Sequence, residues 1–385
     1  MSSGEAIGRV GICTLGMDGG RSGIGRYTCS LIDELRDLRP AWQVDLIGQG
    51  QDRDLFGELP EMWRWVPVPS WVRGAVPEIA WMQLGLRRLA RERSWDVAFM
   101  TAANRRLAYS LPCVSVGTVH DFSSLHVEGK YDRWRRFYIL RVLPALVRRL
   151  DRVLSVSRAS ARDIEAFGGV PSSRIDVVPN GVNPRETSPP DEARRRIAAR
   201  LGIEAPWLLY TSRLEHPGKN HVRLIAAFER LLADHPRLPH RLVLAGADWN
   251  GSEIVHGRIG ESPVADRIWT PGFVEQEVLD DLVDGADMVA FPSLYEGFGL
   301  PVLESMAAGI PVACSNLSSL PEVGGEAVVY FDPYDESSIA QAVAQILVGS
   351  GRQDCIAAGL RRARDQTWRR TAVETISCLE RAVSS

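Results

Sequence analysis

The chain has 385 residues, of which 45% are hydrophobic and 24% are charged, and its formal net charge is −3 at pH 7. This length is better accommodated by two domains than by one hydrophobic core. The composition is ordinary for a soluble globular protein, and no run of about 18 apolar residues is present to span a membrane. The charge balance gives no indication of a nucleic-acid partner, and we expect none.

The two halves of the chain differ in charge. Residues 1–185 carry 26 basic and 20 acidic side chains, whereas residues 186–385 carry 19 and 28. This agrees with two domains and indicates an anionic partner for the first, although sequence drift would also produce it. Residues 1–7 are too short and polar for a signal peptide. We expect a cytoplasmic protein with reduced thiols and no zinc framework, because no C-x-x-C pair occurs among Cys13, Cys29, Cys113, Cys314, Cys355 and Cys378.

The first predicted unit is a strand, a glycine-rich loop and a helix. Residues 9–15 predict a buried strand, residues 16–26 (GMDGGRSGIGR) the loop and residues 27–38 the helix. No suitable acidic residue ends the second strand, residues 42–47, so the dinucleotide fingerprint is incomplete. A flexible connector is an equally good interpretation of the loop.

Residues 49–77 predict no regular element and contain Trp63, Trp65 and Trp71. Exposed aromatic rings suit sugar stacking or a lipid surface, but we favour a variable insertion packed on the domain. The same segment contains the only D-x-D sequence, residues 52–54, which we interpret as surface.

A histidine follows one of the next predicted strands. Residues 95–101 and 113–119 are apolar runs typical of buried strands, and the second ends at His120 and Asp121. Ligands of doubly wound sheets bind beyond the carboxyl ends of strands, so His120 is well placed for chemistry, with Asp121 orienting its ring. A lone histidine is nevertheless more often structural.

A basic segment, residues 130–152, contains seven arginines and Lys130. It predicts an amphipathic helix broken near Pro144. Contact with an anionic membrane or a pyrophosphate-linked acceptor is one interpretation, and a solvated helix face is the alternative that we favour. Residues 153–157 and 175–178 predict the last strands of the first domain, separated by a helix over residues 158–167.

The second predicted domain repeats the alternation. A strand, residues 207–212, runs into Arg213 and Lys219 before a helix over residues 221–233. Two cations after a strand end suit a diphosphate. Further elements are predicted over residues 241–245, 268–271, 275–284, 335–348, 352–364 and 370–382.

A loop in this domain resembles an anion site. After a strand over residues 288–291, Gly297 and Gly299 bracket Phe298 before a helix over residues 300–308. Free amides at a helix N-terminus attract phosphate, and the nearby carboxylates of Glu296 and Glu304 can accept hydrogen bonds from hydroxyl groups. Taken without the rest of the chain, this loop is equally well interpreted as a turn with two solvated glutamates.

The loop and helix resemble a known family. E-x7-E enclosing GFG-P, followed by E-x-M-A-x-G-x-P-V, is similar to the signature of the retaining glycosyltransferases of family 4, which have the GT-B fold. The R-x5-K-N spacing from Arg213, the V-H-D sequence at His120 and the P-N-G-V hinge at residues 179–182 match the same family, and the resemblance covers about residues 9 to 380.

The resemblance implies an α/β protein of two Rossmann-like, doubly wound domains facing a cleft. We expect residues 1–183 to form the acceptor-side domain, completed by residues 368–385. Residues 184–367 would form the domain that binds the nucleotide sugar.

The same resemblance implies roles for single residues. His120 would contact the transferred sugar or the acceptor, Glu296 the sugar hydroxyls, Glu304 the ribose, and backbone groups at Val274 the nucleobase. Arg213 and Lys219, with the amides of Gly297, Phe298, Gly299 and Leu300, would hold the leaving diphosphate. The glycine loop would lie over the phosphates or line the acceptor pocket through Gly23, Ile24, Gly25 and Arg26.

The expected reaction is therefore retaining transfer of a hexose from a nucleoside-diphosphate sugar to a saccharide or lipid-linked acceptor, with no cofactor and no metal. GDP-mannose is the first choice of sugar donor. The alternatives are a sugar-nucleotide epimerase of the same fold, a glycogen- or sucrose-type transferase, and a non-catalytic nucleotide-sugar sensor. Peripheral membrane contact would run through residues 130–152.

Overall fold

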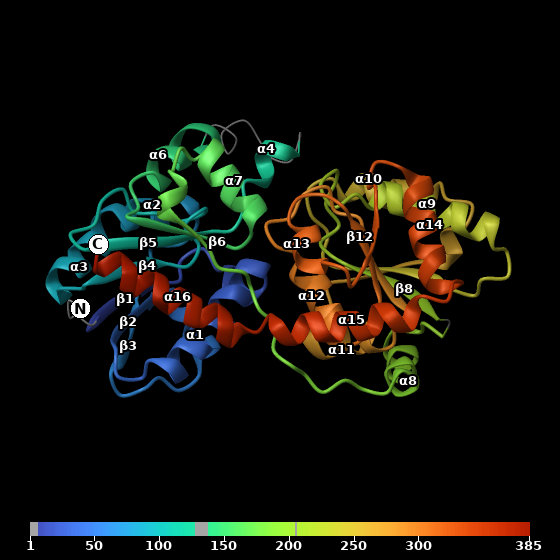
Figure 1. Ribbon diagram of the computed structural model, residues 1–385, viewed down its shortest axis with the longest axis horizontal. Coiled ribbons are helices and arrows are strands. Elements are labelled where there is room, and N and C mark those ends of the chain that lie inside the picture. The colour runs from blue at the N-terminus through green and yellow to red at the C-terminus, as the bar shows by residue number, and fades with distance from the viewer. Residues whose placement is uncertain (1–6, 128–137, 205) are drawn as a thin grey trace. The chain divides into compact units, whose positions relative to one another are not determined.

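The computed structural model describes residues 7–127, 138–204 and 206–385 (Figure 1). The chain divides into two compact units. The described parts of residues 1–122, 133–181 and 367–385 form the first, and those of 123–132 and 182–366 form the second. Each unit is a parallel sheet with helices, which confirms the predicted α/β class.

The first unit contains a seven-stranded parallel sheet of order β3-β2-β1-β4-β5-β6-β7. Its central strands are apolar and buried, as expected for strands covered on both faces. In register, Val10 of β1 pairs with Val44 of β2 and Val97 of β4. The strands are β1 (Arg9–Cys13), β2 (Gln43–Gly48), β3 (Trp63–Pro67), β4 (Val97–Met100), β5 (Val114–Val119), β6 (Arg152–Ser155) and β7 (Ile175–Val177).

The helices of this unit include one from the far end of the sequence. They are α1 (Gly23–Leu38), α2 (Ala75–Trp81), α3 (Arg87–Arg93), α6 (Leu143–Val147), α7 (Arg158–Ala166) and α16 (Trp368–Val383), with a π-helical stretch at Met82–Leu86. Helix α16 lies beside α1 (Figure 1). The Asp176 carboxylate accepts from Arg152 at 2.7 Å, Arg381 at 2.8 Å and the Cys378 thiol at 3.0 Å, which ties α16 to β7.

The second unit contains a six-stranded parallel sheet of order β10-β9-β8-β11-β12-β13. Helices α9 and α14 pack together, as do α12 and α15. The strands are β8 (Trp207–Thr211), β9 (Arg241–Ala245), β10 (Ile268–Gly272), β11 (Met288–Phe291), β12 (Val312–Ser315) and β13 (Val329–Phe331). The helices are α4 (Ser123–His126), α8 (Pro190–Leu201), α9 (His221–Asp234), α10 (Ser252–Gly260), α11 (Gln276–Asp284), α12 (Leu300–Ala307), α13 (Leu320–Gly324), α14 (Glu336–Leu347) and α15 (Arg352–Asp365).

Each sheet has a point at which the strand order reverses. In the first unit it lies between β1 and β4, and in the second between β8 and β11. Helices leave opposite faces of the sheet on the two sides of such a point, so the loops after its strands diverge and leave room for a ligand. The loops after β8 and β11 contain Arg213, Lys219, Glu296 and Gly299.

The glycine-rich loop expected over residues 16–26 ends earlier than predicted. Helix α1 begins at Gly23, so Gly23, Ile24, Gly25 and Arg26 lie in its first turns and not in a loop. The side chain of Ser22 caps it by accepting from the Gly25 amide at 3.3 Å. A glycine is required at position 25, because a Cβ atom there would lie 2.5 Å from the Met17 carbonyl oxygen.

The tryptophan-rich segment is more regular than expected. It contains a 3-10 helix (Gly50–Phe56) and the edge strand β3, on which Trp63 is buried and donates from its indole to the Arg39 carbonyl at 3.3 Å. Trp71 is 65% exposed. The interpretation of residues 52–54 as surface was also wrong for Asp52. Its side chain is buried, and this burial raises the pKa of the carboxyl group.

The expected membrane-contact segment, residues 130–152, lies partly outside the described residues, which resume at 138. Pro144 occupies the first turn of α6, where a missing N–H is tolerated. The Arg149 guanidinium lies 3.8 Å from the centre of the Tyr109 ring. Across the described ranges, no helix combines the length and apolar character needed to cross a membrane. All six cysteines are free thiols.

Candidate active site

The loops that follow β8 and β11 are joined to each other. The Leu294 amide donates to the Gly218 carbonyl at 3.0 Å. Asn220 is 2% exposed, and its side-chain amide donates to the carbonyls of Pro292 at 3.1 Å and Pro333 at 2.8 Å. Its backbone is left-handed, with φ 59°, a conformation that asparagine tolerates better than most residues. These bonds hold the loops in one arrangement.

Lys219 and Glu296 form an ion pair at the centre of this arrangement. Lys219 Nζ lies 2.6 Å from Glu296 Oε1, and each side chain is 16% exposed. Tyr210 supports it from β8 by donating its hydroxyl to the Lys219 carbonyl at 2.9 Å. Burial alone lowers the pKa of the Lys219 ammonium, but the Glu296 carboxylate and Tyr210 outweigh it, so the pKa is raised overall. Lys219 is therefore charged at neutral pH and has two further N–H donors.

Arg213 lies on the same loop and is more open. Its side chain is 41% exposed, and Nη2 lies 3.4 Å from Oε2 of the buried Glu215. The guanidinium carbon lies 4.6 Å from the centre of the Trp249 ring. Arg213 can therefore present several N–H groups to a ligand while its plane is held.

The loop between β12 and α13 shapes the stretch around Glu296. The Ser318 hydroxyl accepts from the Glu296 amide at 3.0 Å, and the buried Ser319 hydroxyl lies 2.9 Å from the Glu296 carbonyl and 2.7 Å from that of Phe298. Gly299 then begins α12 with φ 107°, and no side chain caps the helix. Pro301 has no N–H and the Val302 amide donates to the Gly299 carbonyl at 3.1 Å, so the positive end of the helix and the amide of Leu300 remain to face the loop.

Phe298 and Leu300 are 6% and 7% exposed, so their side chains pack within the unit. Glu304 lies on α12 and is half-buried. Its charge adds to that of Asp284 and Asp280 in raising the pKa of Arg185 against the effect of burial. After β10, Val274 is half-buried and the neighbouring Phe273 is 59% exposed.

In the first unit, His120 follows β5 and is 6% exposed. Its Nε2 lies 2.8 Å from the Thr101 carbonyl, which can only accept, so Nε2 carries the proton and Nδ1 is left as an acceptor. The Tyr27 ring packs edge-on against it at 4.7 Å. Burial lowers the pKa of His120 to about 4, with Arg105 acting in the same direction and Thr101 and Asp121 opposing.

The predicted residues thus lie in two groups, each within its own unit. Arg213, Lys219, Glu296, Glu304 and Val274, with the loop from Gly297 to Leu300, belong to the second unit. His120, Asp121 and the start of α1 belong to the first. The ring bond that orients His120 through Nε2 goes to the Thr101 carbonyl, whereas Asp121 acts on the ring through its charge.

Both parts of the chain match family models. Residues 194–362 match the model of glycosyl transferases group 1, and residues 21–186 match that of glycosyltransferase family 4. The chain is 31% identical over 271 residues to the O-antigen chain mannosyltransferase B of Escherichia coli, which covers 68% of this chain and 69% of the relative. The chain therefore belongs to the glycosyltransferase family whose two parts these models describe. It is therefore an enzyme that transfers a sugar from a sugar donor.

Other relatives and structures agree at the level of family or fold. A glycogen synthase of Mycobacterium tuberculosis is 31% identical over 305 residues, covering 75% of this chain and 68% of the relative. HepE of Anabaena, solved in complex with UDP-glucose, superposes with a TM-score of 0.72 at 19% identity, covering 96% of this chain and 98% of that chain. This likeness establishes the two-unit glycosyltransferase fold.

Sequence reasoning missed three residues that support this candidate site. Trp249 lies on the loop after β9, and Ser318 and Ser319 are neighbours on the loop after β12. Trp249 lies shortly after the predicted strand over residues 241–245. An aromatic residue beyond the carboxyl end of a strand could have been predicted to lie near a ligand site. The two serines gave no usable signal, because β12, the strand before their loop, was not predicted.

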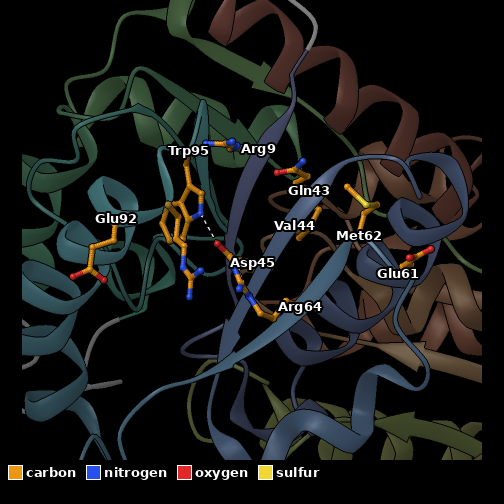
Figure 2. Close-up of a pocket in the computed structure, with 10 residues that line it drawn as sticks. Arg9, Gln43, Val44, Asp45, Glu61, Met62, Arg64, Glu92 and Trp95 are labelled. Atoms are coloured by element: carbon orange, nitrogen blue, oxygen red, sulfur yellow. Dashed lines mark hydrogen bonds and ion pairs between the residues drawn. The ribbon is translucent and has the colours of Figure 1, made fainter.

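A cavity of about 470 Å³ lies elsewhere, near the amino ends of strands of the first sheet (Figure 2). Its central carboxylate is already satisfied, since Asp45 accepts from Arg64 at 2.6 Å and from the Trp95 indole at 2.8 Å. The indole lies over Gly11, where a Cβ atom would come 2.5 Å from the ring. We interpret this cavity as a structural feature of the sheet edge.

In the described ranges, no three His, Cys, Asp or Glu side chains are grouped so as to hold a metal ion.

Proposed function

We propose that this glycosyltransferase transfers a hexose, with mannose as first choice, from a nucleoside-diphosphate sugar to a saccharide or lipid-linked acceptor. The supporting observation is the arrangement at the β8–β11 reversal: Arg213 and Lys219 lie on the loop beside the uncapped start of α12. Two cations and a helix N-terminus form a site for a diphosphate. Mannose is supported by the similarity to a mannosyltransferase.

The proposed chemistry retains the configuration of the sugar. The bond between the anomeric carbon and the diphosphate oxygen breaks, and the acceptor oxygen bonds to the same face of that carbon. The proton of the acceptor hydroxyl goes to the departing phosphate oxygen. No metal is required, because protein groups carry the charge of the leaving diphosphate. Arg213, Lys219 and the α12 amides stabilise the negative charge that develops on the leaving diphosphate.

Carboxylates serve the sugar and the ribose. Glu296 accepts hydrogen bonds from sugar hydroxyls while still contacting Lys219, and Glu304 accepts from the ribose. Backbone groups around Val274 bind the nucleobase. In the first unit, neutral His120 offers Nδ1 as an acceptor to a hydroxyl of the sugar or of the acceptor, which suits a residue that does not have to change charge near neutral pH.

The test is thermal unfolding with GDP, UDP, ADP and dTDP, each with and without EDTA. A ligand that binds only the folded state stabilises it by about 2.7 kcal/mol at a hundred times its Kd, so one nucleotide should raise Tm clearly. We expect that nucleotide to be GDP and the shift to survive EDTA.

The matched variant carries Lys219→Met with Glu296→Gln, which removes the ion pair without leaving a buried charge unpaired. It should lose most of the nucleotide-induced shift, whereas Gly257→Ala, at an open helical position, should keep it. A shift with UDP alone would replace the mannose donor but keep the transferase. The absence of a shift with every nucleotide would contradict the proposal. A non-catalytic sensor would show the shift but release no GDP from GDP-mannose.

A further inference from the structure

Trp249 lies against the arginine of the proposed diphosphate site. The centre of its ring is 4.6 Å from the guanidinium carbon of Arg213, within the range of a cation–π contact. The two side chains are comparably open, since Arg213 is 41% and Trp249 45% exposed. Single exposed aromatic side chains are common on protein surfaces, so it is the contact with Arg213 that distinguishes Trp249.

The backbone brings the two residues together rigidly. Beyond the ends of β8 and β9 the chain continues as a short parallel ladder, in which Leu214 donates to the Ala247 carbonyl at 2.9 Å and Trp249 donates to that of Leu214 at 3.1 Å. A third bond, from the His216 amide to the Asn250 carbonyl at 3.0 Å, extends it. The side chains of Arg213 and Trp249 therefore start from fixed positions.

A glycine makes this approach possible. A Cβ atom at Gly246 would lie 1.9 Å from the Ser212 carbonyl oxygen, so any other residue would push the two loops apart. The ladder that carries Arg213 and Trp249 begins immediately after this contact. The close approach of the loops thus depends on glycine, and the contact between the two side chains depends on that approach.

The guanidinium is held from two directions. The indole ring of Trp249 packs against the guanidinium group, and Oε2 of the buried Glu215 lies 3.4 Å from Nη2 of Arg213. A free, half-exposed arginine samples many rotamers, and fixing one of them on binding costs side-chain entropy. Contacts that exist before the ligand arrives reduce that cost and leave the remaining N–H groups available.

We propose that Trp249 is a positioning residue, which holds the Arg213 guanidinium in the orientation that receives the diphosphate of the sugar donor. This inference rests on the proposed function, in which Arg213 binds that diphosphate. Trp249 acts through Arg213 and contributes to donor affinity only while the arginine is present. An aromatic ring of another kind can replace the indole, whereas a small side chain cannot.

The experiment is a double-mutant cycle on the affinity for GDP, or for whichever nucleoside diphosphate gives the largest thermal shift. Kd is measured by calorimetry for the wild type, Trp249→Ala, Trp249→Phe, Arg213→Gln and the double variant Arg213→Gln with Trp249→Ala. The glutamine keeps a hydrogen-bond donor near Glu215 but removes the charge. Tm is recorded for each variant, so that a loss of folding is not read as a loss of affinity.

We expect Trp249→Ala to raise Kd about two- to fivefold, which corresponds to the loss of an exposed cation–π contact. Trp249→Phe should keep most of the wild-type affinity, because its ring can still contact the guanidinium. Arg213→Gln should raise Kd about tenfold or more, as the loss of a charged hydrogen bond does. The double variant should bind no more weakly than Arg213→Gln alone.

Three results would overturn the inference. If Trp249→Ala weakens binding equally with and without Arg213, the indole contacts the nucleotide directly. If Arg213→Gln weakens binding but Trp249→Ala does not, the arginine is positioned without the ring. If Arg213→Gln leaves Kd unchanged, the diphosphate role of Arg213 in the proposed function fails first, and the role of Trp249 with it.

Discussion

At the scale of single residues, the environment determines the chemistry more than the residue type does. His120 and Lys219 were both recognisable in the sequence, but their partners were not. Lys219 meets Glu296, 77 positions away, and His120 meets the Thr101 carbonyl. Neither pairing follows from local spacing, because each depends on which strands become neighbours in the sheet.

His120 should make the stability of the protein depend on pH. Its folded pKa, lowered to about 4 by burial, lies below the ordinary value of 6.5. Between these values the unfolded chain binds a proton that the folded chain does not, so the free energy of unfolding falls as pH is lowered from 6.5 towards 4. The loss is about 3 kcal/mol at most and is complete near pH 4.

The measurement is urea unfolding between pH 4 and 7 for the wild type and His120→Gln. The variant should show a shallower decline, because its side chain does not titrate. His221 in the second unit, with a pKa lowered to about 3 by burial, contributes in the same direction, and its change to glutamine should add to that of His120. Equal pH slopes in the wild type and His120→Gln would contradict the prediction.

At the scale of elements, the structure differs from the sequence-based predictions mainly in the segments between strands and helices. The strands β9 and β11 were predicted to the residue, because short apolar runs are a strong signal. Seven helices were predicted to within two residues at each end: α7, α9, α11, α12, α14, α15 and α16. The start of α1 was missed because glycines favour a loop on local grounds, although here the loop packs on Gly25 and requires it. Helices α8 and α10 were missed because their apolar faces are short.

Replacement of Gly299 should destabilise the turn that leads into α12. Its φ of 107° is unfavourable for any residue with a Cβ atom, and such an atom would lie 2.7 Å from Leu320 Cδ2. We expect Gly299→Ala to cost on the order of 1–3 kcal/mol of stability and to weaken GDP binding by moving the first amides of the helix. Chemical denaturation and calorimetry measure the two effects.

The control is Gly257→Ala, on the exposed part of α10, where nothing lies within 4 Å of a new Cβ atom. It should be neutral or stabilise the protein by up to about 1 kcal/mol, as alanine does within a helix. If both substitutions had the same effect, the turn at Gly299 would not be specially constrained.

At the scale of the whole molecule, the two units differ in how the chain builds them. The second unit contains the unbroken run Val182–Gln366, whereas the first needs residues 367–385 in addition to the early part of the chain. The return of the last helix was expected from the family resemblance alone. No property of α16 itself, an ordinary amphipathic helix, indicates which sheet it covers.

Removal of residues 367–385 should therefore unfold the first unit. Helix α16 contributes the buried side chains of Trp368, Ile376 and Leu379, and it packs on α1, β5 and β6. Burial of three such side chains is worth about 5 kcal/mol or more, comparable with the whole stability of many domains. Thermal unfolding and limited proteolysis should show loss of the first unit's transition.

Deletion of only the exposed Ser384 and Ser385 is the matched control and should leave both transitions in place. An unchanged first transition after removal of all of 367–385 would show that α16 is a cover and not part of the core.

The return of α16 also has a consequence for synthesis on the ribosome. Residues 367–385 emerge only after the whole of Val182–Gln366, so the first sheet waits without its last helix while the second unit has all of its strands. Domains usually fold in the order in which they are made. Here the part of α1 that α16 covers stays exposed until residues 367–385 have been made, and the unit that is begun first is completed after the second.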